Sequence, residues 1–248
     1  MIDVHVVGPE PIERELALAE LDEEHFATPA WAVDVIVPHL PLSGLIVDPC
    51  SGAGAIAGRL VETWGVAPFR VTAVELHPGR AEQDRQRLQG AQVVSADFLG
   101  LRQGVEIEQV SLVVGNPPFS QSKLFVEKAL ELVASCNGTV AMLLRLSWLS
   151  SKDRRALLKT HPPDVYVLST RPSFAATLTC GVKGKSKGCG WRVSIAPEAP
   201  RTKSCPTCNG AVSCTTTDAT DYGWFCWGPG RGGRWFLPDG GPPDKAAV

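Results

Sequence analysis

The sequence predicts an α/β protein whose short strands form a mostly parallel sheet covered by helices on both faces. Apolar runs of four to six residues alternate along the chain with stretches of helical periodicity. Several of these runs end in a carboxylate or an amide side chain. In parallel sheets ligands bind beyond the carboxyl ends of the strands, so these polar residues also predict where a site would lie.

The predicted elements follow one another in a regular order. Strands are expected at residues 45–48, 70–75, 91–95, 109–114, 139–144, 165–168 and 222–227, with a further short one at 235–237. Helices are expected at 12–24, 28–40, 53–64, 79–89, 120–135 and 151–160. Thr28-Pro29 opens the second of these helices, because Thr can cap it and Pro suits the first helical position.

The composition changes along the chain and predicts one domain with an insertion. Residues 26–174 and 218–238 are expected to form the domain, after a lead-in at residues 1–25. Residues 175–217 carry five of the eight Cys and little hydrophobic periodicity, so they are expected to be inserted between the last two strands. Residues 239–248, rich in Gly, Pro and Asp, are expected to be a disordered tail.

The charge is distributed unevenly although the net charge is only -2. Residues 1–150 carry 10 basic and 19 acidic side chains, whereas residues 151–248 carry 14 and 7. This asymmetry indicates either a C-terminal part that faces a polyanion or a solvated basic loop. No apolar run reaches the roughly 18 residues of a membrane-spanning helix, and no signal peptide is evident. A soluble, cytoplasmic protein without a membrane partner is expected.

The first predicted strand is followed by the loop Asp48-Pro49-Cys50-Ser51-Gly52-Ala53-Gly54, which opens a helix. The two glycines allow a ligand to approach the backbone. The loop has neither the G-x-G-x-x-G turn of a dinucleotide site nor a Gly-Lys-Ser/Thr, and it contains no basic residue. It therefore favours a cofactor that carries an amine over one that carries a pyrophosphate.

Acidic residues also mark the ends of the next two strands: Glu75 ends the second, and Asp97 follows the third. Glu75 has the position at which a carboxylate receives two ribose hydroxyls. Asp97 could accept a hydrogen bond from an adenine amine, and Phe98 could lie on its ring. Such an acid is often a turn or helix cap, but three at successive strand ends predict a site for a nucleoside-containing cofactor.

These residues resemble the motifs of the class I S-adenosylmethionine-dependent methyltransferases. The resemblance implies a Rossmann-like fold with a seven-stranded, mostly parallel sheet, and S-adenosylmethionine as cofactor. The segment Phe26-x-Thr28-Pro29 is similar to one that closes over the methionine end of the cofactor in the amino-methylating branch, and Trp31 would line the same pocket. The residues expected to bind the cofactor are Phe26, Thr28, Pro29, Asp48, Pro49, Cys50, Gly52, Gly54, Glu75, Leu76, Asp97, Phe98 and Asn116.

Asn116-Pro117-Pro118-Phe119 ends the fourth predicted strand and indicates the chemistry. Two prolines stiffen the turn, so that a planar amine could donate to the Asn116 side chain and the Pro117 carbonyl. Phe119 offers a stacking face. The alternative is a rigid turn, but the tetrapeptide resembles the catalytic motif of amino-methyltransferases, which implies that its four residues are catalytic.

The motif order favours adenine in DNA as the substrate, since it resembles one branch of DNA adenine methyltransferases of phage or prokaryotic type. The resemblance implies a prokaryotic or phage-infected cell. A nucleobase amine in RNA and a glutamine amide in a protein stay open as alternatives. A nucleic acid is expected to contact Arg171, Ser173, Phe174, Lys183, Lys185, Lys187, Trp191 and Arg192, mostly in the basic insertion.

Cysteines in the insertion predict a structural zinc site. Cys205 and Cys208 form a C-x-x-C knuckle, and Cys180 and Cys189 lie upstream. Four thiolates close a tetrahedral site that would stabilise so small a segment. Cys214 is a competing ligand, and free thiols are the alternative.

Overall fold

The computed structural model describes residues 27–102, 109–174, 176–181, 189–195, 202, 204–216 and 220–241. Phe26, the predicted helix at 12–24, and Lys183, Lys185 and Lys187 lie outside the described residues. The side chains of Arg192 and Cys214 also lie outside them, although both residues belong to strands. Within the described part of the chain, no helix has the length and apolar character needed to cross a membrane.

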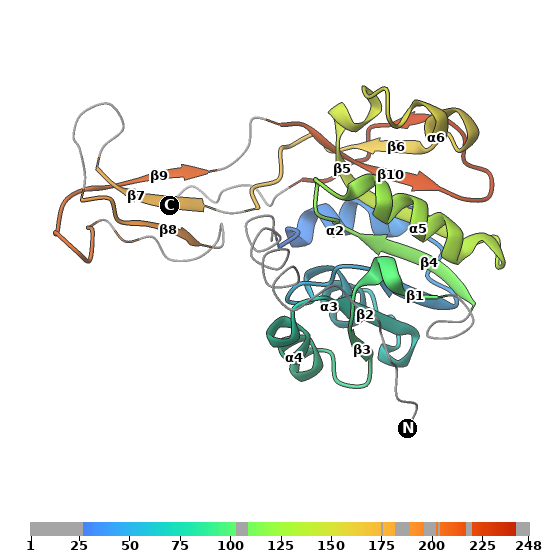
Figure 1. Cartoon of the computed structure of the whole chain (residues 1–248), viewed down its shortest axis with the longest axis horizontal. Helices are drawn as coiled ribbons and strands as arrows, with labels where there is room; N and C mark the ends of the chain where they lie inside the picture. Colours follow the sequence, from blue (N-terminus) through green and yellow to red (C-terminus); the bar gives the residue numbers. More distant parts are fainter. Residues whose placement is uncertain are drawn as a thin grey trace.

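The centre of the molecule is an eight-stranded sheet in the order β11-β6-β10-β5-β4-β1-β2-β3 (Figure 1). The strands are β1 (Leu45–Asp48), β2 (Val71–Glu75), β3 (Gln92–Ser95), β4 (Val110–Gly115), β5 (Thr139–Arg145), β6 (Asp164–Val167), β10 (Tyr222–Trp227) and β11 (Trp235–Phe236). All neighbours pair in parallel except β10, which is antiparallel to β5 and β6. The mostly parallel sheet is confirmed, and the further short strand expected at 235–237 is β11, which makes eight strands where the resemblance implies seven.

Helices cover both faces of this sheet, as predicted. They are α2 (Ala30–Ile36), α3 (Ala55–Glu62), α4 (Pro78–Arg87), α5 (Ser122–Ala134) and α6 (Arg155–Thr160), with short 3-10 turns η1 (Val37–His39), η2 (Pro68–Arg70), η3 (Phe98–Gly100) and η4 (Leu146–Leu149). The expected Thr28 cap is wrong, because α2 begins after Pro29 without a side-chain cap.

The core forms two layers because successive strand residues face opposite sides. Ile46 of β1 packs with α2 and α3 in one layer, and its neighbour Val47 packs with α5 in the other. Strands β4 and β5 are buried almost throughout, which explains why they read as continuous apolar runs. This packing holds the carboxyl ends of β1, β2 and β4 beside one another.

A second, smaller sheet lies between β6 and β10 in the chain. It consists of β7 (Ala176–Cys180), β8 (Arg192–Ile195) and β9 (Val212–Thr216) in the antiparallel order β8-β7-β9. It projects from the large sheet at the left of Figure 1. Gly240 in the expected tail accepts a hydrogen bond from Ser169 Oγ at 3.2 Å, and residues 242–248 lie outside the described ones.

Candidate active site

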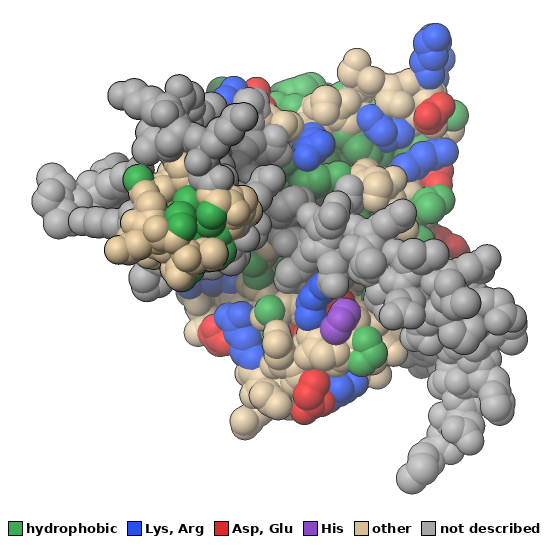
Figure 2. Space-filling model, turned by 60° about the vertical axis from the view of Figure 1, so that its left-hand side comes forward, with side chains coloured by type: hydrophobic (Ala, Val, Ile, Leu, Met, Phe, Trp, Pro, Cys, Tyr) green, Lys and Arg blue, Asp and Glu red, His purple; other side chains and the backbone are tan. Residues whose placement is uncertain are grey.

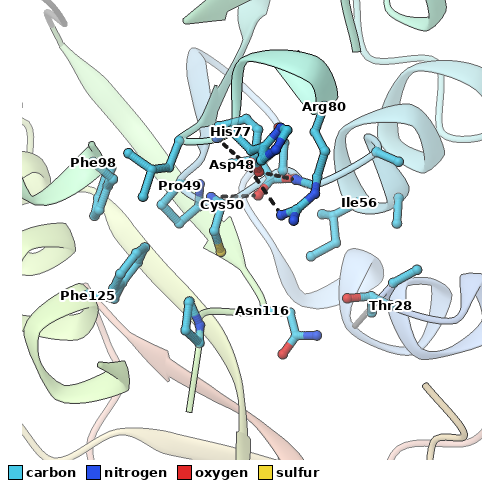
Figure 3. A pocket seen from close by; sticks show the side chains of 18 of the residues that line it. Thr28, Asp48, Pro49, Cys50, Ile56, His77, Arg80, Phe98, Asn116 and Phe125 are labelled. Atoms are coloured by element: carbon cyan, nitrogen blue, oxygen red, sulfur yellow. Dashed lines mark hydrogen bonds and ion pairs between the residues drawn. The ribbon is translucent and has the colours of Figure 1, made fainter. Parts of the chain in front are cut away.

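A pocket lies at the carboxyl ends of β1, β2, β3 and β4, where the sequence predicts a ligand (Figure 3). Phe98 and Phe125 lie on one side of it and Thr28 on the other, with Asn116 between them. The lining residues are Ala27, Thr28, Asp48, Pro49, Cys50, Ser51, Gly52, Ala53, Ala55, Ile56, Glu75, Leu76, His77, Arg80, Ala96, Asp97, Phe98, Asn116, Pro118, Gln121 and Phe125.

Asp48 at the end of β1 is a buried carboxylate with spare hydrogen-bonding capacity. Its side chain accepts a long hydrogen bond from the Cys50 N–H at 3.4 Å, and its Oδ2 atom has no partner among the described residues. Burial, and then the charge of Asp84, raise the pKa of Asp48 to about 8. A buried carboxyl group of this kind favours a cationic ligand, because a cation stabilises its charged form.

Glu75 at the end of β2 is fixed by backbone donors on both oxygens. Gly52 N–H donates to Oε2 at 2.9 Å, and His77 N–H donates to Oε1 at 2.8 Å. Arg80 from α4 reaches the same carboxylate at 3.6 Å. Burial raises the pKa of Glu75 despite these donors. The Glu75 carboxylate therefore joins the loop after β1 to the turn after β2, and it keeps lone pairs that can accept hydrogen bonds from hydroxyl groups.

The glycine-rich loop is held against α4 by a third buried carboxylate, that of Asp84. Ser51 Oγ donates a hydrogen bond to Asp84, which is fully buried. Gly54 has a φ of +70°, and a Cβ there would come within 2.6 Å of Asp84 Oδ1. Gly54 is thus required for the close approach of the loop to α4, although it does not line the pocket.

Asp97 and Phe98 follow β3 and take different environments. Asp97 is exposed, and its Oδ1 accepts a hydrogen bond from Leu99 N–H at 2.9 Å, which caps η3. Phe98 is 2% exposed and stacks on Phe125 of α5 with ring centroids 5.4 Å apart. The two rings form an apolar wall of the pocket.

The predicted catalytic loop directly adjoins the predicted cofactor loop. A Cβ on Gly115, the last residue of β4, would come within 2.6 Å of Pro49 Cδ, so only glycine allows this contact. The next residue, Asn116, and Pro118 both line the pocket, while Pro117 is buried behind them. The structure thus brings the amide of Asn116 into the pocket that contains Asp48 and Glu75.

Phe119 lies outside the residues that line this pocket and has aromatic and cationic neighbours. Its ring centroid is 5.7 Å from that of Tyr222 and 6.4 Å from that of Phe174. The Arg145 guanidinium carbon lies 4.4 Å from the ring centroid, and Arg145 Nε donates to Tyr222 Oη at 3.3 Å. One face of Phe119 is therefore covered by Arg145, a neighbour that sequence patterns did not indicate.

Most of the residues predicted to bind the cofactor come together here. Thr28, Asp48, Pro49, Cys50, Gly52, Glu75, Leu76, Asp97, Phe98 and Asn116 all line the pocket. Pro29, Gly54 and Trp31 do not, and Phe26 lies outside the described residues. The sequence patterns did not indicate His77, Arg80, Gln121 and Phe125, which also line the pocket.

The four cysteines of the predicted metal site also come together. The sulfur atoms of Cys180, Cys189, Cys205 and Cys208 all lie within 4.8 Å of one another. Cys180 and Cys208 are 3.4 Å apart, and Cys189 and Cys205 are 3.6 Å apart. With Zn–S bonds of about 2.3 Å, tetrahedral ligands lie about 3.8 Å apart, so this donor set fits a zinc ion.

The predicted nucleic-acid contacts are distributed more widely. Arg171 is exposed and pairs with Asp221 at 2.7 Å. Ser173 Oγ is buried and has no partner among the described residues, and Phe174 is 4% exposed against Tyr222. Trp191 is half-buried, and its carbonyl accepts from the N–H of Cys180 beside the cysteine cluster. Phe174 thus packs in the core instead of offering an open surface.

Comparisons with known proteins agree with this fold. No family model matches the chain. A release factor glutamine methyltransferase of Streptomyces coelicolor is 36% identical over 96 residues, which cover 36% of this chain and 31% of that protein. A predicted O-methyltransferase of Agrobacterium tumefaciens superposes with a TM-score of 0.51 at 16% identity over 84% of each chain. The 23S rRNA methyltransferase ErmE gives 0.45 at 15% identity, over 85% of this chain and 71% of that one.

The matched segment thus spans about a third of its curated relative. The strand order and the Agrobacterium tumefaciens neighbour define the fold: the chain has a Rossmann-like methyltransferase fold. Its pocket lies at the carboxyl ends of the strands, as in other open α/β sheets.

Proposed function

We propose that this protein is an S-adenosylmethionine-dependent methyltransferase that methylates the 6-amino group of adenine in DNA. One observation carries the proposal: Asn116 lies in the same pocket as Asp48 and Glu75. One cavity therefore contains both parts of a methyl-transfer site. The Asn116 amide can hold a planar amine, and the Asp48 and Glu75 carboxylates can hold a nucleoside that carries a charged amine.

The pocket fits S-adenosylmethionine in its donor set. Asp48 Oδ2, buried and without a described partner, suits the ammonium group. Glu75 has lone pairs left for the ribose hydroxyls, and Phe98 and Phe125 offer apolar surface to the adenine. When bound, the cofactor supplies an electrophilic methyl group on a sulfonium ion.

Asn116 and the Pro117 carbonyl would each accept one hydrogen bond from the substrate amine and thereby orient its lone pair. The two prolines keep these acceptors rigid, so that positioning and electrostatics provide the rate. No strong base is needed, because the nitrogen can lose its proton after methyl transfer. In a DNA duplex the adenine must leave the stack to reach this pocket.

Two other substrates have the planar amine that the site requires: a glutamine amide in a protein and a nucleobase amine in RNA. The glutamine methyltransferase that matches 96 residues favours a protein glutamine amide, which is also a planar amine. An amine in RNA would use the same acceptors. The excess of basic residues after residue 150 supports a nucleic acid over a protein, and the order of the motifs supports DNA.

We also propose that the cysteine cluster binds a structural zinc ion. Two of its sulfurs belong to Cys180, which ends β7, and Cys189, which precedes β8; the other two come from the Cys205–Cys208 knuckle. Thr207 N–H donates to Cys205 Sγ at 3.4 Å, as expected around a thiolate ligand. The metal would stabilise the small sheet and hold Trp191, next to the cluster, where a nucleic acid could contact it.

The test is transfer of tritium from labelled S-adenosylmethionine to duplex DNA, structured RNA or a glutamine-containing protein. The proposal expects label in DNA, recovered as N6-methyladenine after digestion. The E75Q variant serves as a cofactor-site control and should lose label from every acceptor. Label only in RNA or only in protein would overturn the DNA assignment, and no label in any acceptor would overturn the activity.

A further inference from the structure

A second concave surface lies along α6, away from the pocket. This α6 groove holds about 890 Å³ of open space and is lined by Leu149, Ser150, Ser151, Lys152, Arg155, Leu158 and Lys159. Its lining contains three basic residues, all exposed, and no acidic one. Figure 2 shows Lys and Arg side chains over both the upper and the lower part of one face of the molecule, with Asp and Glu side chains among them. The groove therefore has a positive surface that solvent can reach.

The three cations of the groove are unusual in their lack of counter-ions. Lys152, Arg155 and Lys159 form no side-chain hydrogen bond, ion pair or ring contact within the described part of the chain. By contrast, Lys123 and Lys128 on α5 pair with glutamates at 3.6 and 3.2 Å. Three unpaired like charges within eight residues repel one another and favour an extended polyanion.

Hydrogen bonds connect the start of the groove to the catalytic loop. Trp148 Nε1 donates to Ser122 Oγ at 3.1 Å, and Ser122 Oγ donates to the Phe119 carbonyl at 2.9 Å. Leu149, the first residue of the groove, directly follows Trp148. Arg154 stiffens this segment from the other side, donating to the Trp148 carbonyl at 2.6 Å with its guanidinium over the indole. The groove therefore begins at a segment that is tied to the catalytic loop.

We propose that the α6 groove binds the sugar-phosphate backbone of the substrate strand beside the target base. The inference rests on the proposed function in requiring a nucleic acid as substrate. Phosphate oxygens would accept hydrogen bonds from Lys152, Arg155 and Lys159, while Leu149 and Leu158 provide apolar contact for the sugars. Phosphate contacts fix register without reading sequence. The groove thus positions the strand, whatever segment selects the target site.

The test compares two triple variants by fluorescence anisotropy with a labelled 20-base-pair DNA duplex and a 20-nucleotide RNA. One variant carries K152A, R155A and K159A. The control carries R85A, K123A and K128A, which removes three charges paired with glutamates elsewhere. Each lost phosphate contact lowers the slope of log Kd against log salt by about 0.9 on duplex DNA. The groove variant should lose about 2 to 3 units of slope and bind at least tenfold more weakly, and the control should match the wild type.

Kinetics give a second readout: the groove variant should raise the KM for nucleic acid and keep kcat and cofactor affinity. A K152Q/R155Q/K159Q variant repeats the test if the alanine variant unfolds. A wild-type salt slope in the groove variants would overturn this inference and leave the proposed function intact. Failure of the wild type to bind either nucleic acid would overturn both. If the wild type binds RNA but not DNA, and the groove variant loses affinity and salt slope for RNA, the role of the groove is supported and the substrate is RNA instead of DNA.

Discussion

Asp48 gives a quantitative test of the cofactor site because its pKa is raised to about 8, first by burial and then by Asp84. At pH 7 the carboxyl group of the ligand-free protein is therefore mostly protonated. A ligand with an ammonium group favours the ionised form, so binding releases a proton below the raised pKa. Cofactor affinity should rise with pH and level off above about pH 8.

The size of the effect follows from the same value. Each pH unit below the pKa corresponds to about 1.4 kcal/mol, or tenfold in the ionised fraction. Between pH 6 and pH 8 the Kd of S-adenosylhomocysteine should fall by on the order of 10- to 50-fold. Isothermal titration calorimetry across this range measures it. S-adenosylhomocysteine keeps its amine protonated there and carries no reactive methyl group.

Two controls isolate the carboxyl group. The D48N variant cannot ionise, so it should bind more weakly than the wild type at pH 8 and show no such pH dependence. 5′-Methylthioadenosine lacks the ammonium group and should bind the wild type with little change between pH 6 and 8. A wild-type affinity that is constant over this range, or an equal slope in D48N, would refute the role assigned to Asp48.

The raised pKa also makes a prediction for stability. An acid whose pKa rises on folding destabilises the fold once it ionises, so the contribution of Asp48 to the stability of the ligand-free wild type should fall as pH increases from about 4 to about 8. D48N avoids this loss, and its unfolding temperature relative to the wild type should increase with pH over the same window. Differential scanning calorimetry without cofactor measures the difference, and a difference that shrinks with pH would contradict the burial argument.

Other sites give three further predictions. Asn116→Ala should lower turnover at least a thousandfold while the Kd of S-adenosylhomocysteine changes less than threefold, because the amide holds the substrate amine; normal methylation by the variant would contradict this role. Gly115→Ala should reduce both unfolding temperature and turnover, since its Cβ would meet Pro49 Cδ at 2.6 Å; Gly232→Ala, with open space at its Cβ and no positive φ, should change both little. Cys205→Ser should lower the zinc content measured by mass spectrometry from one to near zero per chain and destabilise the small sheet, whereas Cys136→Ser, at an exposed cysteine outside the cluster, should keep the metal.

The sequence was sufficient to predict the large sheet and the strand-end residues of the site. Parallel strands converge at their carboxyl ends, so Asp48, Glu75 and Asn116 could be placed together from the chain order alone. Helical contributions could not be placed in this way. Phe125 and Arg80 lie within ordinary helical patterns, and only the packing of α5 and α4 shows that they face the pocket.

The insertion shows a different limit of sequence reasoning. Residues 175–217 have little hydrophobic periodicity, yet three strands form there. Strand patterns are visible in a sequence when one face packs against an apolar core. Here four sulfurs lie at the end of a small sheet, so the spacing of cysteines was informative where apolar alternation was not. The position of Arg145 over Phe119 likewise depends on tertiary packing alone.

The most direct measurement of the central claim is the modified-base content of DNA from cells that express the wild type or Asn116→Ala. The account predicts N6-methyladenine at defined sites, read at base resolution, in cells with the wild type and none above background with the variant. Unmodified adenine in the wild-type cells, together with new methylation in RNA or on protein glutamine, would contradict it.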